Sequence, residues 1–180
     1  MSQEIETKVL GVDPQAIKEK LSALGAEKIL DTTLTVDWFR TAGSKEGDDQ
    51  WYLRSRTTSD GKTEVTWKGL SQVLGASRTH KEVNIKVDDA AKVADLFAEI
   101  NLEHYAHQEK KRTSWVYKDW HFDLDTYPNV PQYLEIEGKD EAQIQAAIAL
   151  LGLEENEKYP GGERLLISEK YGLNWYEMRF

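Results

Sequence analysis

The chain has 180 residues, of which 39% are hydrophobic and 31% charged, a composition typical of a soluble globular protein with one sizeable core. The net charge of −9 argues against nucleic acid and an anionic membrane as partners. The absence of cysteine excludes disulfides, zinc–thiolate sites and thiol catalysis. No stretch approaches the roughly 18 apolar residues that span a membrane, and the N-terminus has no apolar signal-peptide core. We therefore expect a single cytoplasmic domain over residues 1–180.

Helices are predicted in four places. The first begins at Asp13 and Pro14, an N-cap followed by a proline at the first helical position, and ends at Gly25. The second follows Asp88-Asp89, the third runs from Asp140 to Gly152, and a shorter one covers residues 163–171. The apolar faces of the first three are Ile17, Leu21 and Leu24; Val93, Leu96, Phe97 and Ile100; and Ile144, Ile148 and Leu151.

Between the helices, apolar and polar residues alternate with a period of two, which predicts strands. The Asp60-Gly61 pair separates two of them and is a strong hairpin signal. Strands grouped in this way, with helices interspersed, favour an antiparallel α+β fold. The predicted strands cover residues 3–10, 33–41, 50–58, 62–69, 76–87, 104–108, 110–118, 119–126 and 132–138.

Charged residues share one face of nearly every predicted strand, because residues two apart in a strand point the same way. In a single strand this is the solvated face of an ordinary amphipathic strand. In the set, however, acids gather on the first and last strands and bases mainly on the middle ones. The shared faces are Glu4, Glu6 and Lys8; Arg54 and Arg56; Thr66 and Lys68; Arg78, His80, Glu82 and Asn84; Lys110 and Arg112; Asp123 and Asp125; and Glu135 and Glu137.

The opposite faces are apolar and need cover, which the amphipathic helices can provide; the residues concerned are Ile5, Leu53, Trp67, Val83 and Ile136. A β-barrel with helices packed outside it satisfies both faces and leaves a polar lumen. Carboxylates in such a lumen suit hard ions such as Mg²⁺ or Mn²⁺. Arginine and lysine suit phosphate oxygens. Metal and several bases together indicate a ligand with several negative charges, such as a polyphosphate.

Five motifs in chain order resemble those of the CYTH proteins, or triphosphate tunnel metalloenzymes. This family includes class IV adenylyl cyclases and thiamine, inorganic and RNA triphosphatases. The resemblance implies an eight-stranded antiparallel β-barrel tunnel. The motifs are Glu4-Ile5-Glu6-Thr7-Lys8, Leu53-Arg54-Ser55-Arg56, Thr66-Trp67-Lys68-Gly69, Glu109-Lys110-Lys111-Arg112, and Phe122-Asp123-Leu124-Asp125 with Leu134-Glu135-Ile136-Glu137.

The resemblance also implies the roles of the inward residues. Lys8, Lys68 and Glu137 are the expected catalytic residues. A second metal or a carboxylate, Glu137 or Asp125, would position and activate water, and Lys8 would contact phosphate or help the water lose its proton. The implied metal ligands, for Mg²⁺ or Mn²⁺, are Glu4, Glu6, Glu82, Asp125, Glu135 and Glu137. The implied phosphate contacts are Lys8, Arg54, Arg56, Lys68, Lys110 and Arg112. Arg78 is expected to substitute for the base that the family has at the position of His80.

Two strands depart from the family pattern and leave the substrate open. His80 and Asn84 stand where the family usually has a base and an acid, and Val36-Asp37-Trp38-Phe39-Arg40 is only loosely similar to the second family strand. The leading interpretation is a metal-dependent hydrolase of a triphosphate-containing small molecule: inorganic triphosphate first, a nucleoside or thiamine triphosphate otherwise. The alternatives are a class IV adenylyl cyclase, which makes cyclic AMP and pyrophosphate from ATP, and a non-catalytic polyphosphate or nucleotide binder.

The remaining aromatic residues and histidines are expected to be structural. His104, His107 and His121 are scattered along the sequence and are expected to be surface or core residues rather than ligands. The six tryptophans are expected to pack in the core or on the barrel exterior. The apolar C-terminus, with Trp175 and Phe180, would cap the barrel or contact a second subunit, so a homodimer stays open.

Overall fold

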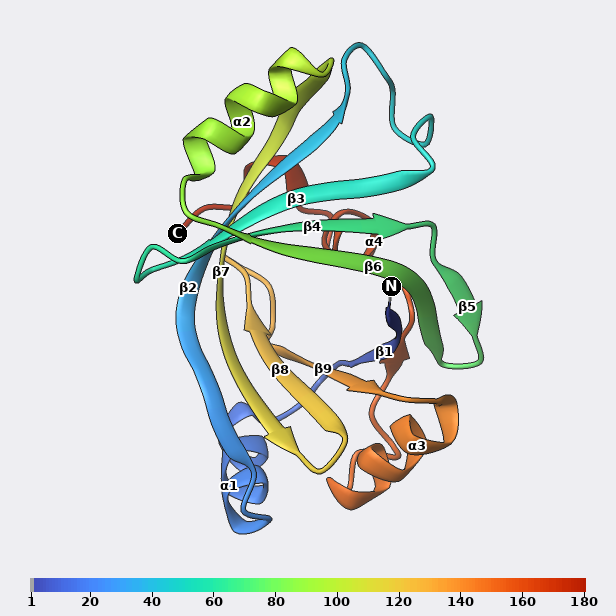
Figure 1. Ribbon diagram of the computed structural model, residues 1–180. Helices are drawn as coiled ribbons and strands as arrows, with labels where there is room; N and C mark the ends of the chain where they lie inside the picture. The colour runs from blue at the N-terminus through green and yellow to red at the C-terminus, as the bar shows by residue number, and fades with distance from the viewer. Residues whose placement is uncertain (1) are drawn as a thin grey trace.

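Eight antiparallel strands close into a barrel (Figure 1). The structure is a computed structural model that describes residues 2–180, with side chains from residue 5 onward. Pairing of β6 with β1 closes the barrel, with Glu6 opposite Arg78. Around the barrel the strands are β1 (Ser2–Val9), β9 (Tyr133–Gly138), β8 (Trp120–Thr126), β7 (Leu102–Tyr117), β2 (Glu27–Thr41), β3 (Trp51–Thr58), β4 (Thr63–Gly69) and β6 (Ser77–Val87).

The predicted α+β barrel is confirmed, with some differences in its strands. The segments predicted at 104–108 and 110–118 form one long strand, β7, which pairs along its length with an equally long β2. Two short strands were not predicted. One is β5 (Gln72–Leu74), which extends the sheet beyond β6, and the other is β10 (Lys158–Tyr159), which pairs with the end of β1.

The helices begin at the predicted caps. The Asp13 carboxylate accepts hydrogen bonds from the backbone of the first turn of α1 (Pro14–Ala23), and Asp89 and Asp140 do the same for α2 (Ala90–Glu99) and α3 (Glu141–Leu150). The predicted C-terminal helix is α4 (Glu163–Leu165), which continues as a π-helical turn, Leu166–Lys170.

Apolar packing is concentrated in three clusters. Figure 1 shows α1 and α3 below the barrel, where Ile17 and Ile144 join the outward side chains of β1, β8 and β9. The C-terminal segment contributes Leu166 and Trp175 to a second cluster. In the third, Phe97 of α2 packs against the barrel strands. The first and third clusters hold the barrel from outside, whereas the second reaches its interior at Trp175.

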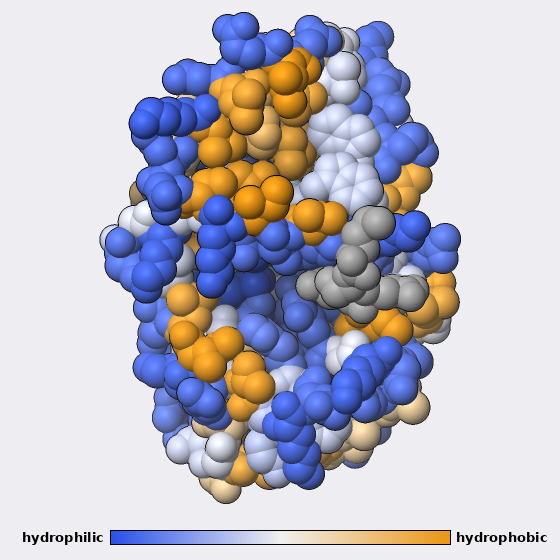
Figure 2. All heavy atoms as spheres, in the orientation of Figure 1, coloured by the Kyte–Doolittle hydropathy of each residue, from blue (hydrophilic) through white to orange (hydrophobic). Residues whose placement is uncertain are grey.

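Helical cover of the outer wall is only partial. On the predicted apolar face of α2, Phe97 is buried, whereas Leu96 is 57% and Ile100 58% exposed. Val83 and Ile85 of β6 are also exposed, so the expectation that a helix covers Val83 is wrong. Figure 2 shows apolar residues gathered on this upper part of the molecule. Among residues 2–180, no helix combines the length and the hydropathy needed to cross a membrane.

Candidate active site

The barrel interior is a cavity of about 650 Å³ with charged walls. It opens on the face seen in Figure 2, where a hollow in the middle is lined by hydrophilic residues. Strand alternation directs these side chains inward, as the sequence pattern predicts. Nine of the predicted site residues line the cavity: Glu6, Arg54, Arg56, Lys68, Arg78, Glu82, Arg112, Glu135 and Glu137.

Three glutamates from two paired strands converge on one wall of the cavity. Glu6 of β1 is directly opposite Glu137 of β9, and Glu135 is two residues from Glu137 on the same face. One carboxylate oxygen from each of the three lies within 4.8 Å of the others. Glu4 lies in β1 opposite His80, but its side chain is outside the described part of the chain. Three oxygen donors at this spacing can hold a hard divalent ion.

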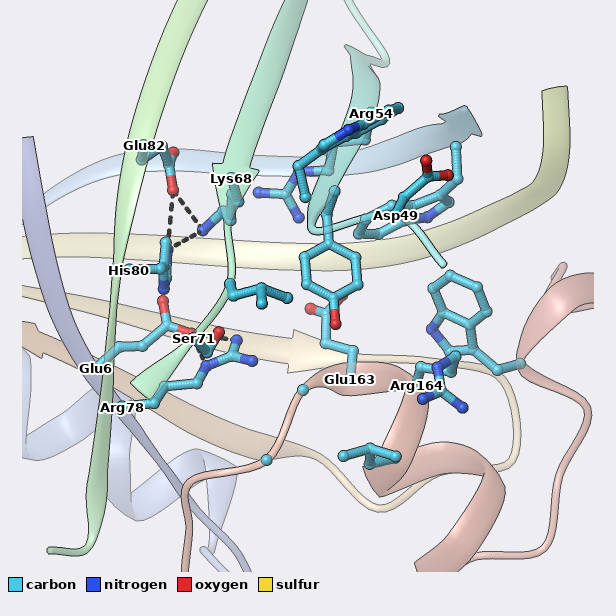
Figure 3. Close-up of a pocket in the computed structure, with 18 of the residues that line it drawn as sticks. Glu6, Asp49, Arg54, Lys68, Ser71, Arg78, His80, Glu82, Glu163 and Arg164 are labelled. Carbon is cyan, nitrogen blue, oxygen red and sulfur yellow. Dashed lines mark hydrogen bonds and ion pairs between the residues drawn. The ribbon is translucent and has the colours of Figure 1, made fainter. Parts of the chain in front are cut away.

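Basic side chains adjoin the glutamate cluster. Arg78 donates from Nε to Oε1 of Glu6 at 2.6 Å, and the Lys8 ammonium is 2.6 Å from Glu135 and 3.7 Å from Glu6. Figure 3 shows Arg78 directed at Glu6 from the neighbouring strand. Burial and the Glu135 carboxylate raise the pKa of Glu6, but Arg78, Lys68 and Lys8 outweigh them and lower it to about 2. Glu6 therefore stays ionised at neutral pH.

Arg54 is a buried arginine with a second arginine, Arg56, close to it. Its guanidinium is buried, lies over the Trp38 ring at 5.5 Å, and has an Nε with no hydrogen-bond partner among the described residues. Burial and the neighbouring Arg56 lower the pKa of Arg54. Figure 3 places it on the upper wall of the cavity. A buried, under-satisfied guanidinium that faces a cavity favours binding of an anion there.

A second charged group on β4 and β6 lies near the first. The Lys68 ammonium is 2.5 Å from Glu82 and 3.0 Å from Nε2 of His80, and Asn84 donates to Glu82 at 2.7 Å. The dashed lines of Figure 3 mark the contacts among Lys68, His80 and Glu82. The unusual residues His80 and Asn84 thus hold the Glu82 carboxylate, and Glu82 does not belong to the three-glutamate cluster.

A closed charge network lies beside the cavity. Lys110 is completely buried, lies 2.9 Å from Asp125, and also pairs with Glu163. Tyr127 donates to Glu163 at 2.9 Å and Tyr133 at 3.3 Å. Within the described part of the chain, Lys110, Asp125 and Lys8 do not line the cavity. Lys110 and Asp125 are therefore satisfied within this network, whereas Glu163 also lines the cavity.

Arg112 joins the closed network to the open cavity. Its Nε donates to Asp125 at 2.6 Å, its Nη2 lies 3.4 Å from Glu135, and its Nη1 pairs with Asp123. Burial raises the pKa of Asp123, but Arg112 and His121 lower it to about 2. Burial lowers the pKa of His121, yet Asp123 and Glu137 raise it above its ordinary value. His121 also lines the cavity, a position that the expectation of a surface or core residue missed.

One end of the cavity is aromatic. Trp38 and Trp175 lie 5.2 Å apart between ring centroids, and Tyr105 and Tyr176 flank Trp175. All four line the cavity, and Trp38 and Trp175 also belong to the second apolar cluster, as expected of core residues. The Trp175 Nε1 is buried with no hydrogen-bond partner among the described residues. The wall offers ring faces and a donor to a group that extends beyond the charged region.

Sequence reasoning missed Glu163, although a signal for it exists. Pro160-Gly161-Gly162 precede the helix that carries it, and both glycines are in close contact with neighbours. A Cβ on Gly161 would lie 2.5 Å from the Tyr159 ring. The glycine pair thus lets α4 approach the barrel closely, and Glu163, its first residue, reaches into the interior (Figure 3).

Comparison with solved structures finds the same barrel. A candidate adenylate cyclase from Vibrio parahaemolyticus superposes with a TM-score of 0.77 at 15% identity, over 92% of this chain and 97% of that one. A Hippeastrum protein, described as a candidate adenylyl cyclase with a dominant triphosphatase activity, has a TM-score of 0.66 at 13% identity, over 97% of each chain. The triphosphatase of the mimivirus capping enzyme has a TM-score of 0.51 at 10% identity, over 84% and 90%. At these identities the likeness shows the fold alone.

The sequence itself matches a family profile over most of its length. A comparison with curated proteins gave no match. The profile of the CYTH domain, in contrast, matches residues 2–162, which include every barrel strand and every predicted site residue. The chain therefore belongs to the CYTH family.

Proposed function

We propose that this chain is a divalent-metal-dependent triphosphatase whose substrate binds inside the barrel. The observation that carries the proposal is the composition of a single cavity. Three clustered glutamates lie on one wall, and the buried, under-satisfied Arg54 guanidinium lies on another. A ligand that satisfies both walls has several negative charges and binds together with a cation.

The residues present fit Mg²⁺ or Mn²⁺. Glu6, Glu135 and Glu137 offer only hard oxygen donors, which suit these ions. Enzymes of the CYTH family are triphosphatases or adenylyl cyclases and depend on a divalent metal. The bound ion would neutralise phosphate charge and orient the phosphate chain. Glu4 stays a predicted fourth ligand.

The basic residues would bind and polarise the phosphate chain. Arg54 and Arg56 offer several N–H donors in fixed geometry, and Lys68 supplies a point charge. Glu137 is the least buried of the three clustered glutamates and would accept a proton from water as its oxygen attacks the terminal phosphorus. The bond from that phosphorus to the bridging oxygen then breaks. Arg54 and Arg112 would stabilise the negative charge that develops on the leaving diphosphate.

A substrate panel tests the proposal. Inorganic triphosphate, ATP, GTP and thiamine triphosphate are incubated with Mg²⁺ or Mn²⁺, and phosphate release is measured for the wild type and for Glu6→Gln. We expect metal-dependent release in the wild type and its loss in the variant. Equal activity in both proteins contradicts the metal assignment. Calorimetric binding of triphosphate without release over hours would instead indicate the non-catalytic binder.

The aromatic end of the cavity supports a second candidate, an adenylyl cyclase. Trp38, Tyr105 and Trp175 offer surfaces against which a base could stack. In that reaction the ribose 3′-oxygen attacks the α-phosphorus, its proton passes to a base, and pyrophosphate leaves. The products from ATP and Mn²⁺ separate the two reactions. Cyclic AMP with pyrophosphate indicates the cyclase, and ADP with phosphate indicates the triphosphatase.

A further inference from the structure

A second cluster of metal-ligating side chains lies on the outer wall of the barrel. Asp37 of β2 faces His104 and His107 of β7. Nε2 of His104 lies 2.9 Å from Oδ1 of Asp37, and Nδ1 of His107 lies 2.7 Å from the same oxygen. The side chains of Asp37, His104 and His107 are 29%, 48% and 25% exposed, so an ion from solvent can reach them.

A β-bulge creates the cluster. Residues three apart in a regular strand point to opposite faces, so His104 and His107 would normally be separated by the sheet. Here Trp38 pairs with Ala106 and the next residue, Phe39, pairs with His104, so Tyr105 is the extra residue of β7. The bulge resets the alternation and brings both imidazoles to the face of Asp37, which is directly opposite His107.

The donor set differs from that of the tunnel. Two imidazole nitrogens and one carboxylate oxygen suit borderline ions such as Zn²⁺, which often takes three protein ligands and one water. The tunnel cluster has oxygen donors only. Metal–ligand distances of about 2.0–2.1 Å separate neighbouring tetrahedral donors by roughly 3.3 Å. The two nitrogens therefore need to move from Oδ1 by about half an ångström, which partly exposed side chains can do.

A pocket beside the cluster leaves room for a further ligand. Its volume is about 310 Å³, and its walls include Asp37, His104 and the small residues Ala90, Ala91 and Ala94 of α2. Figure 1 shows α2 alongside the upper part of the barrel, where these strands run. The Phe39 ring meets the His104 imidazole edge-on at 5.6 Å between centroids and holds it toward the pocket side. A fourth coordination position can thus be filled by water.

We propose that Asp37, His104 and His107 form a divalent transition-metal site, with Zn²⁺ as the expected ion, on the outer wall of the barrel. The site is separate from the triphosphate site, because its ligands lie on the opposite face of the strands. It ties β2 to β7 at the bulge. A histidine–aspartate hydrogen-bond network that takes no metal is the competing explanation, and the experiment below distinguishes the two.

The test is titration of the full-length, metal-stripped protein with Zn²⁺ and, as a spectroscopic probe, Co²⁺, in excess Mg²⁺ to occupy the tunnel carboxylates. We expect one equivalent of Co²⁺ with the intense visible absorption of a tetrahedral site with nitrogen ligands, and its displacement by Zn²⁺. His104→Ala, His107→Ala and Asp37→Asn should each weaken Zn²⁺ binding by more than about 100-fold, since losing even an outer-shell partner costs 10–100-fold.

Two control variants separate this site from the tunnel. His121→Ala removes a histidine from the tunnel wall, and Glu6→Gln removes a tunnel carboxylate. Both should keep the tetrahedral Co²⁺ spectrum and the Zn²⁺ affinity of the wild type. The near-isosteric Asp37→Asn guards against misfolding as a cause of lost binding, and its circular dichroism spectrum should match the wild type. The proposal is overturned if the wild type shows no tetrahedral Co²⁺ spectrum, or if His104→Ala and His107→Ala bind Zn²⁺ as tightly as it does.

Discussion

Two charge groups of the barrel interior, one around Lys110 and one around Arg54, contain similar residues but differ in how their charges are paired. Around Lys110, each described charge has a partner of opposite sign, with Asp125 and Glu163 on either side of the ammonium. Around Arg54, the largest effect of a neighbouring charge on its pKa comes from another arginine, Arg56, and its Nε has no hydrogen-bond partner among the described residues. The difference supports the proposal that the first set of charges stabilises the fold and that the second binds an anionic ligand.

The largest expected effect is on the stability of the protein and concerns the charge network around Lys110. Lys110→Met should lower the free energy of unfolding by about 3–5 kcal/mol, because it leaves two buried carboxylates without their cation. Urea denaturation measures it. Lys62→Met is the matched control, since its pair with Asp60 is 83% and 57% exposed and should leave the denaturation midpoint unchanged. A stable Lys110→Met protein would contradict the supporting role of this network.

The next effect is on activity and concerns Arg54 in the cavity wall. Arg54→Met should lower kcat/KM for triphosphate by about 10²–10³-fold, the usual cost of removing a donor that stabilises transition-state charge. Stability should change little, because the substitution removes a guanidinium that burial and Arg56 already disfavour. Steady-state kinetics and urea denaturation of one sample measure both. If stability falls while kcat/KM is kept, Arg54 belongs with the closed network.

Asp123, which pairs with Arg112, should make stability depend on pH. Arg112 and His121 depress its folded pKa from 3.8 to about 2. The stabilisation is present above pH 3.8 and is lost as the pH falls through about 2, a change of about 2 kcal/mol. The midpoint of urea denaturation is measured from about pH 5 to about pH 2, a range set by these pKa values. It should fall less steeply with decreasing pH for Asp123→Asn than for the wild type. Parallel curves would mean that the carboxylate is not held by its partners.

The smallest effect concerns two tyrosines, Tyr127 in the closed network and Tyr176 in the cavity wall. Tyr127→Phe removes the buried hydrogen bond to Glu163 and should cost about 1.5 kcal/mol of stability, with KM unchanged. Tyr176→Phe removes a more exposed bond to Glu46 and should leave stability unchanged. Thermal denaturation of the two variants compares them. An equal loss of stability in both variants would contradict the distinction between the closed network and the open cavity.

Strand alternation was enough to predict the inward residues, because a barrel keeps the period of two wherever its strands are regular. Arg54, Glu135 and Glu137 all line the cavity in this way. Alternation fails where a strand is irregular. It separates His104 from His107, and only the bulge at Tyr105 reunites them. No period of residues predicts such a bulge.

The second limit is distance along the chain. Glu163 and Trp175 enter the interior from segments outside the barrel strands, so no strand pattern indicates them. Their placement depends on how the C-terminal segment packs across the barrel end, with Leu166 and Ile167 buried in a cluster shared with β2. The aromatic end of the cavity, which bears most on the substrate, is therefore the part that sequence predicted least.

One comparison tests the central claim, that the open cavity with its glutamate cluster is the metal and triphosphate site. Glu137→Gln, which keeps the size of a half-buried side chain in the glutamate cluster, is measured beside the wild type for Mn²⁺ binding by calorimetry and for phosphate release from triphosphate. We predict that the variant binds Mn²⁺ at least about tenfold more weakly and loses metal-dependent release, with an unchanged melting temperature. Unaltered Mn²⁺ affinity and unaltered release in the variant would contradict the account.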